Sequence, residues 1–194
     1  MMNQIIYNSF PRSGNIYSGF LSNCFFDSTF STVHIPEIFS VDELDNVTIF
    51  RKPEDAISSF INKQFKSSIK IDMASVTHKA INGCELYRSY MHHAKINKDK
   101  IYIGVFEDLI GDTVKHFENV AKKFNRDLDL NYKSNFKNVE FSGNLWDNKY
   151  DGHIPRDKDE VRLDIEEKVS SLNIIKKINK EYEDFILEYQ TKTK

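Results

Sequence analysis

A short basic turn near the start of the chain has the residue types that bind an anion. The turn covers residues 11–15, with the sequence Pro-Arg-Ser-Gly-Asn, and separates an apolar run at 5–7 from a helical pattern that begins at Asn15. In a strand–turn–helix unit, the backbone N–H groups of the turn and the positive end of the helix dipole face the same place. Arg12 adds a guanidinium to these donors. The pattern therefore predicts a cradle for one phosphate or sulfate group.

A second basic element follows another predicted strand. Arg51 comes directly after the apolar run at 47–50, and Pro53 opens a helical segment that carries Ser59, eight residues after Arg51. A guanidinium and a hydroxyl in this arrangement can bind a second phosphate through charge-assisted hydrogen bonds. Two anion sites after two strands predict a nucleotide ligand with phosphates at both ends.

The first turn is not a Walker A loop, because it has one glycine and its basic residue precedes that glycine. It resembles the 5′-phosphosulfate loop of the sulfotransferases that use 3′-phosphoadenosine 5′-phosphosulfate (PAPS). Arg51 and Ser59 are similar to that family's arginine and serine for the 3′-phosphate. The segments Val-His-Ile-Pro at 33–36 and Val-Phe-Glu-Asp-Leu at 105–109 also resemble family motifs. The four motifs occur in the family's order, over about residues 4 to 125.

The resemblance implies a set of residues that bind the sulfuryl donor PAPS. Six of them lie in the turn and the start of the first helix: Arg12, Ser13, Gly14, Asn15, Ile16 and Tyr17. The other two, Arg51 and Ser59, lie in the second basic element. Arg12 would also stabilise the charge that grows on the leaving phosphate. Tyr17 stands at the family's tryptophan position, where a ring stacks on adenine. Ile16 replaces a threonine that contacts the 5′-phosphate in the family.

His34 is the candidate general base, so that His34 and Arg12 are the predicted catalytic residues. An imidazole can take a proton from an acceptor hydroxyl near neutral pH, and the histidine of the family's corresponding segment is its base. Glu37 is the alternative, because some branches of the family use a carboxylate. Thr32 stands where many soluble members have a lysine, so one transition-state cation is missing at that position.

Other readings of the same residues stay open. One is a P-loop-like nucleotide or phosphoryl-transfer enzyme, which the missing Walker lysine and Mg²⁺ ligands disfavour. Another is a catalytically inactive nucleotide-binding protein with a sulfotransferase fold, suggested by Thr32, Ile16 and Phe106 at positions where the family has other residues. The family's late Arg-Lys-Gly segment has no clear counterpart. Three basic residues are candidates to replace it: Lys137, Lys149 and Arg156.

Length and pattern predict one α/β domain that covers residues 1–194. Strands that alternate with helices imply a parallel sheet between two helical layers, a three-layer fold related to nucleotide kinases. Residues 125–156 are predicted to form a long functional loop. Strand patterns cover 4–10, 30–35, 46–50 and 100–106, and helical patterns cover 15–26, 53–65, 75–95, 113–124 and the segment from 159 onward, with a break near 170–173.

The composition limits the partners that we expect. The net charge of −2 gives no global basic field, so nucleic acid is not an expected partner. No run of residues has the length and apolarity of a membrane span, no signal peptide is recognised, and Cys24 and Cys84 fit reduced buried thiols, so we expect a cytoplasmic protein. The histidines lack metal-ligand spacing, so no metal is expected. The expected acceptor is a small molecule, sugar, lipid headgroup or peptide with a hydroxyl or amine, and the oligomeric state is left open.

Overall fold

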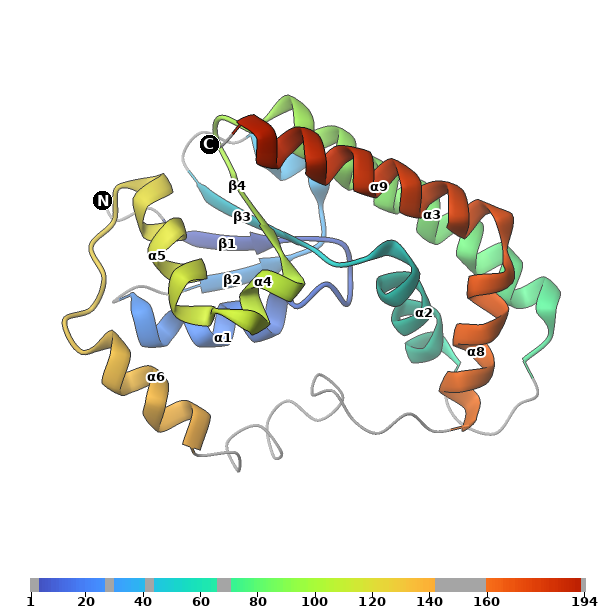
Figure 1. Cartoon of the computed structure of the whole chain (residues 1–194), viewed down its shortest axis with the longest axis horizontal. Helices are drawn as coiled ribbons and strands as arrows, with labels where there is room; N and C mark the ends of the chain where they lie inside the picture. The colour runs from blue at the N-terminus through green and yellow to red at the C-terminus, as the bar shows by residue number, and fades with distance from the viewer. Residues whose placement is uncertain (1–3, 27–29, 41–43, 66–70, 142–159, 193–194) are drawn as a thin grey trace.

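The computed structural model describes residues 4–26, 30–40, 44–65, 71–141 and 160–192, and these form an α/β fold around a parallel sheet (Figure 1). Within these ranges the sheet has four strands in the order β2-β1-β3-β4. The strands are β1 (Ile5–Asn8), β2 (Phe30–Val33), β3 (Asp45–Phe50) and β4 (Tyr102–Val105). Tyr7 pairs with Thr32 on one side and with Val47 on the other, which fixes the register of the three strands that lead to the site.

Helices cover both faces of this sheet, as the alternating pattern predicts. One layer contains α1 (Asn15–Phe25) and α5 (Thr113–Phe124), and the other contains α2 (Pro53–Gln64), α3 (Met73–Ile96), α8 (Glu160–Ser171) and α9 (Asn173–Lys192). Two separate hydrophobic cores lie between the helices and the sheet. Successive residues of a strand face opposite sides, and accordingly Ile49 belongs to one core while Phe50 belongs to the other. The predicted three-layer α/β class is confirmed.

Most predicted elements appear with small differences at their ends, but two predictions were wrong. Phe106 does not end the fourth strand, because helix α4 (Phe106–Gly111) begins directly after Val105. The predicted loop at 125–156 contains helix α6 (Tyr132–Phe141), which forms because its aromatic residues pack on α1. The rings of Tyr132 and Phe136 have their centroids 5.5 and 5.6 Å from that of Phe25. Residues 142–159 of that predicted loop lie outside the described residues.

The parallel direction of the strands brings the predicted functional segments to one edge of the sheet. The carboxyl ends of β1, β2 and β3 lead into the basic turn, into the 3-10 helix η1 (Pro36–Ser40) and into α2 respectively. Ligands of open α/β sheets bind at this edge, outside the carboxyl ends of the strands. Among the described residues, no helix has the length and apolarity needed to cross a membrane.

Candidate functional site

The turn between β1 and α1 has the backbone shape of an anion cradle. Arg12 and Gly14 both have positive φ angles, of 74° and 95°, with Ser13 between them. The turn is closed by a hydrogen bond of 3.1 Å from the Ser13 N–H to the carbonyl of Phe10. Among the residues that the structure describes, no side chain caps the start of α1, and the sequence of its first turn has no acidic residue. The first N–H groups of a helix have no partner within the helix, so the turn and the helix together present donors to an anion.

Gly14 is required at this position for two reasons. Its φ of 95° is strained for any residue with a Cβ, and a Cβ there would lie 2.7 Å from Cδ2 of the Phe106 ring. The neighbouring Ser13 is fully buried, and its Oγ has no hydrogen-bond partner in the described part of the protein. A buried hydroxyl needs such a partner, so the turn fits a ligand that supplies an acceptor oxygen.

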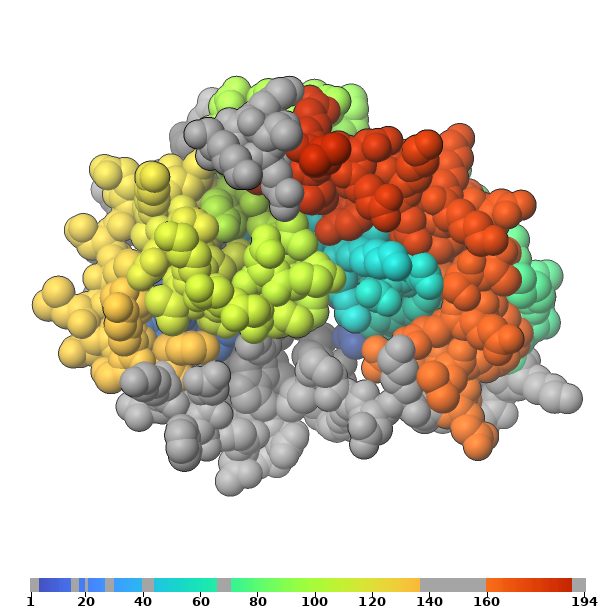
Figure 2. Space-filling model, in the orientation of Figure 1, coloured from blue at the N-terminus to red at the C-terminus, as the bar shows by residue number. Residues whose placement is uncertain are grey.

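The structure brings the two predicted anion-binding elements together. Arg12 Nε donates a hydrogen bond of 3.1 Å to the Oγ of Ser59, on the second turn of α2. Burial lowers the pKa of Arg12, and the charges of Arg162 and Arg51 lower it further. The positive charges of Arg51 and Arg162 thus act on Arg12, and we call these three residues the arginine cluster. Such a concentration of positive charge favours an anionic ligand. Figure 2 shows a small blue area of the N-terminal segment at the surface between α4, the β3–α2 segment and α8.

Arg51 is held by its surroundings at the end of β3. Its guanidinium lies over the ring of Phe106, 5.2 Å from the centroid, in a cation–π contact. Its backbone carbonyl accepts a hydrogen bond from the hydroxyl of Tyr87 on α3. Phe106 also packs on Gly14, so its ring contacts both basic elements. The sequence did not indicate this role for Phe106.

Arg162 is the member of the cluster that the sequence did not reveal. It lies in the first turn of α8, which packs against α2, and its Nε donates a 3.1 Å hydrogen bond to Glu166. No local motif marks it, because its proximity to Arg12 depends on the packing of helices that are far apart in sequence. Of the residues expected to replace the late Arg-Lys-Gly segment, Lys137 falls in α6, and Lys149 and Arg156 lie outside the described residues.

His34 follows β2 and is exposed, with its ring fixed by a neighbouring loop. Its Nδ1 lies 2.7 Å from the carbonyl oxygen of Ser9, which can only accept, so Nδ1 carries a proton. Asn8 holds the next residue in place by donating to the carbonyl of Ile35 at 2.6 Å and accepting from its N–H at 3.0 Å. A proton on Nδ1 makes Nε2 the basic nitrogen, as a general base requires.

For the remaining predicted residues, the structure gives the backbone position but fewer side-chain contacts. Asn15, Ile16 and Tyr17 form the first turn of α1, and their side chains are outside the described part, so the stacking role of Tyr17 stays a prediction. Glu37 lies in η1 and is exposed, and its charge adds to the effect of burial in raising the pKa of Tyr90. Within the ranges that the structure describes, no three His, Cys, Asp or Glu side chains gather as a metal site would require.

Comparison with known proteins identifies the fold. No family model and no curated protein sequence matches the chain. Among solved structures, mouse sulfotransferase SULT7A1 complexed with PAP matches with a TM-score of 0.53 and 14% identity, over 96% of this chain and 84% of that one. A sulfotransferase domain from the olefin synthase of Synechococcus PCC 7002 matches over 93% of this chain and 94% of that one, with a TM-score of 0.49 and 11% identity. The chain has the fold of the sulfotransferases, as its motifs predict.

Proposed function

We propose that this protein is a sulfotransferase that transfers a sulfuryl group from PAPS to an acceptor hydroxyl or amine. The observation that carries the proposal is the hydrogen bond between Arg12 and Ser59, because it joins the two elements predicted to bind opposite ends of one nucleotide. The sulfotransferase fold and the PAP bound to the mouse protein support the same ligand class.

The proposed binding roles follow from the positions of the charges. The N–H groups of the turn and α1 would bind the 5′ end of the donor, and the buried hydroxyl of Ser13 would gain the acceptor that it needs. Arg51 and Ser59 would bind the 3′-phosphate. Arg162 adds a further positive charge from α8 and takes the part that the missing Arg-Lys-Gly segment has in the resembled family.

The proposed chemistry assigns one task to each of two side chains. The donor supplies the sulfuryl group, whose sulfur forms a bond to the acceptor atom as its bond to the bridging phosphate oxygen breaks. His34 Nε2 takes the acceptor proton, and the Ser9 carbonyl stabilises the resulting imidazolium through Nδ1. Arg12 stabilises the negative charge left on the phosphate. Glu37 is the alternative base.

Two measurements test this proposal. Calorimetry with 3′-phosphoadenosine 5′-phosphate (PAP) should show micromolar or tighter binding, with 5′-AMP far weaker. Transfer of radiolabelled sulfate from PAPS to a panel of phenol, sugar and peptide acceptors should then give labelled product. Binding of PAP without transfer to any acceptor would favour the inactive nucleotide-binding alternative. Binding of ATP but not of PAP would overturn the proposal in favour of phosphoryl transfer.

A further inference from the structure

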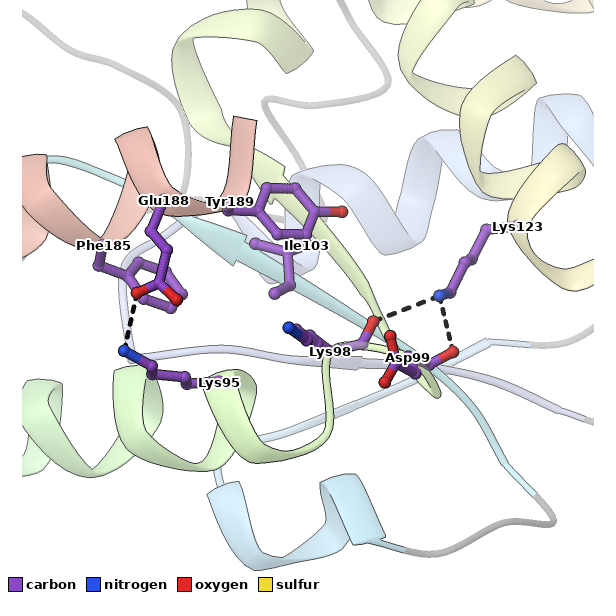
Figure 3. Close-up of a pocket in the computed structure, with 8 residues that line it drawn as sticks. All are labelled: Lys95, Lys98, Asp99, Ile103, Lys123, Phe185, Glu188 and Tyr189. Carbon is purple, nitrogen blue, oxygen red and sulfur yellow. Dashed lines mark hydrogen bonds and ion pairs between the residues drawn. The ribbon is translucent and has the colours of Figure 1, made fainter. Parts of the chain in front are cut away.

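A cavity lies at the opposite end of the sheet from the arginine cluster. It has a volume of about 360 Å³ and is formed by the later parts of α3 and α9, the end of α5 and the loop before β4 (Figure 3). Lys98 and Asp99 in that loop precede the start of β4, whereas Phe106, which contacts the arginine cluster, follows its end. The cavity therefore shares no lining residue with the arginine cluster.

Aromatic and aliphatic side chains give this cavity an apolar side. Ile103 of β4 is buried, and Phe185 and Tyr189 from α9 are half-buried beside it. Burial raises the pKa of Tyr189, and a hydrogen bond with the Ile103 backbone opposes that rise. Two rings and an isoleucine around a cavity of this size suit a flat aromatic group.

Three lysines surround this apolar side. Lys95 forms a 2.7 Å ion pair with Glu188. Lys123 donates to the backbone carbonyls of Lys98 and Asp99 at 3.3 and 2.8 Å, and the Asp99 charge acts on it. The lining thus holds three ammonium groups and two carboxylates, which leaves one positive charge in excess. Figure 3 shows the Lys98 side chain extending into the space below Ile103.

Hydrogen bonds within the protein satisfy some of the carbonyls at the helix ends beside this cavity. A helix C-terminus carries partial negative charge on carbonyls that lack partners. At the end of α3, both the N–H and the side-chain amide of Asn97 donate to the His93 carbonyl. At the end of α5, the N–H of Asn125 donates to the carbonyls of Ala121 and Lys122. These three carbonyls therefore have donors other than the ammonium group of Lys98.

We propose that this cavity is a second ligand site, which binds a small flat aromatic molecule carrying one anionic group. The ring would lie against Ile103, Phe185 and Tyr189, and the anionic group would face Lys98. The proposal does not depend on the function assigned to the arginine cluster, because it rests on other residues at the other end of the sheet.

Calorimetry with naphthalene-2-carboxylate as the probe tests this site. We expect binding to the unmodified protein and about tenfold weaker binding of the neutral naphthalene-2-carboxamide, because the charge-assisted contact is lost. Acetate, which lacks the ring, should show no binding. Absence of binding of the carboxylate at millimolar concentration, or equal affinity for the amide, would overturn the proposal.

Three variants locate the bound probe. Lys98→Gln should weaken carboxylate binding about tenfold. Lys122→Gln, with the same charge change on α5 but outside the cavity lining, is the matched control and should leave binding within about twofold. Arg12→Gln should also leave the affinity for the carboxylate unchanged. If Arg12→Gln loses the probe while Lys98→Gln still binds it, the probe is at the arginine cluster and the proposal is contradicted. Thermal unfolding followed by circular dichroism verifies that each variant is folded.

Discussion

Arg12 Nε donates a 3.1 Å hydrogen bond to Ser59 Oγ, across 47 positions of sequence. The contact links the turn after β1 with the helix after β3. The positive charges of Arg51 and Arg162 repel that of Arg12 and lower its pKa. A ligand with negative charge at both ends would relieve this repulsion, and for that reason most of our predictions concern this contact and its neighbours.

Ser59→Ala should weaken PAP binding about fivefold to tenfold, because one hydroxyl contact to a charged group is lost. Ser58→Ala is the matched control. The Oγ of Ser58 is buried and, among the described residues, is not hydrogen-bonded to Arg12 as Ser59 is. Its removal should therefore leave PAP affinity unchanged and the free energy of unfolding equal or higher. Calorimetry gives the affinities and urea unfolding the stabilities. Equal loss of affinity in both variants would mean that Ser59 has no specific role.

Arg51→Gln should weaken PAP binding by about tenfold or more while 5′-AMP binding changes little, because only PAP has the 3′-phosphate assigned to Arg51. Lys52→Gln carries the same charge change at the next position, where the side chain is exposed, and should leave the ratio of the two affinities unchanged. Titration of both nucleotides into both variants checks this. If Arg51→Gln lowers the two affinities by the same factor, the guanidinium does not distinguish the 3′-phosphate.

Arg162→Gln should weaken PAP binding about fivefold at low salt, which corresponds to about 1 kcal/mol of lost charge attraction. The dependence of the affinity on salt concentration should also become shallower. Lys176→Gln removes a charge from an exposed position on α9 and serves as the control. PAP affinities measured at several salt concentrations test this prediction. If Arg162→Gln and the unmodified protein have the same affinity and the same salt dependence, Arg162 is not part of the site.

The sequence predicted the parts of this site that depend on local structure. The turn at 11–15 and the Arg51–Ser59 element are each continuous in the chain, and the direction of parallel strands brings the ends of β1 and β3 to one edge. Arg162 and Phe106 were not recognised as partners of Arg12 and Gly14, because those contacts depend on how α8 and α4 pack. Helix α6 was missed because its stability comes from packing on α1 rather than from a clear apolar period.

Acid should destabilise the protein through His116. Burial lowers the pKa of this imidazole to about 4, against 6.5 for an ordinary histidine. The unfolded chain therefore binds more protons than the folded one between these pH values, so stability falls as the pH drops from about 6.5 towards 4. The difference corresponds to roughly 3 kcal/mol for complete protonation.

Urea unfolding at pH 7.5 and pH 4.5 measures this loss, and His116→Leu should remove most of the histidine's share of it. His92→Leu replaces an exposed histidine on α3 and is the control, because acidic groups contribute to the pH dependence of both variants alike. If His116→Leu and His92→Leu lose the same stability on acidification, the buried histidine is not its source.

His34→Ala should leave PAP affinity nearly unchanged and reduce turnover by about 10² to 10⁴, because the anion contacts come from other residues while the base is lost. Arg12→Ala should weaken both binding and turnover. Glu37→Gln is the matched control and should keep turnover if His34 is the base. Affinity and turnover are measured on the same preparations across the pH range, with the acceptor found in the transfer screen. Full activity in His34→Ala together with loss in Glu37→Gln would assign the acceptor proton to the carboxylate instead.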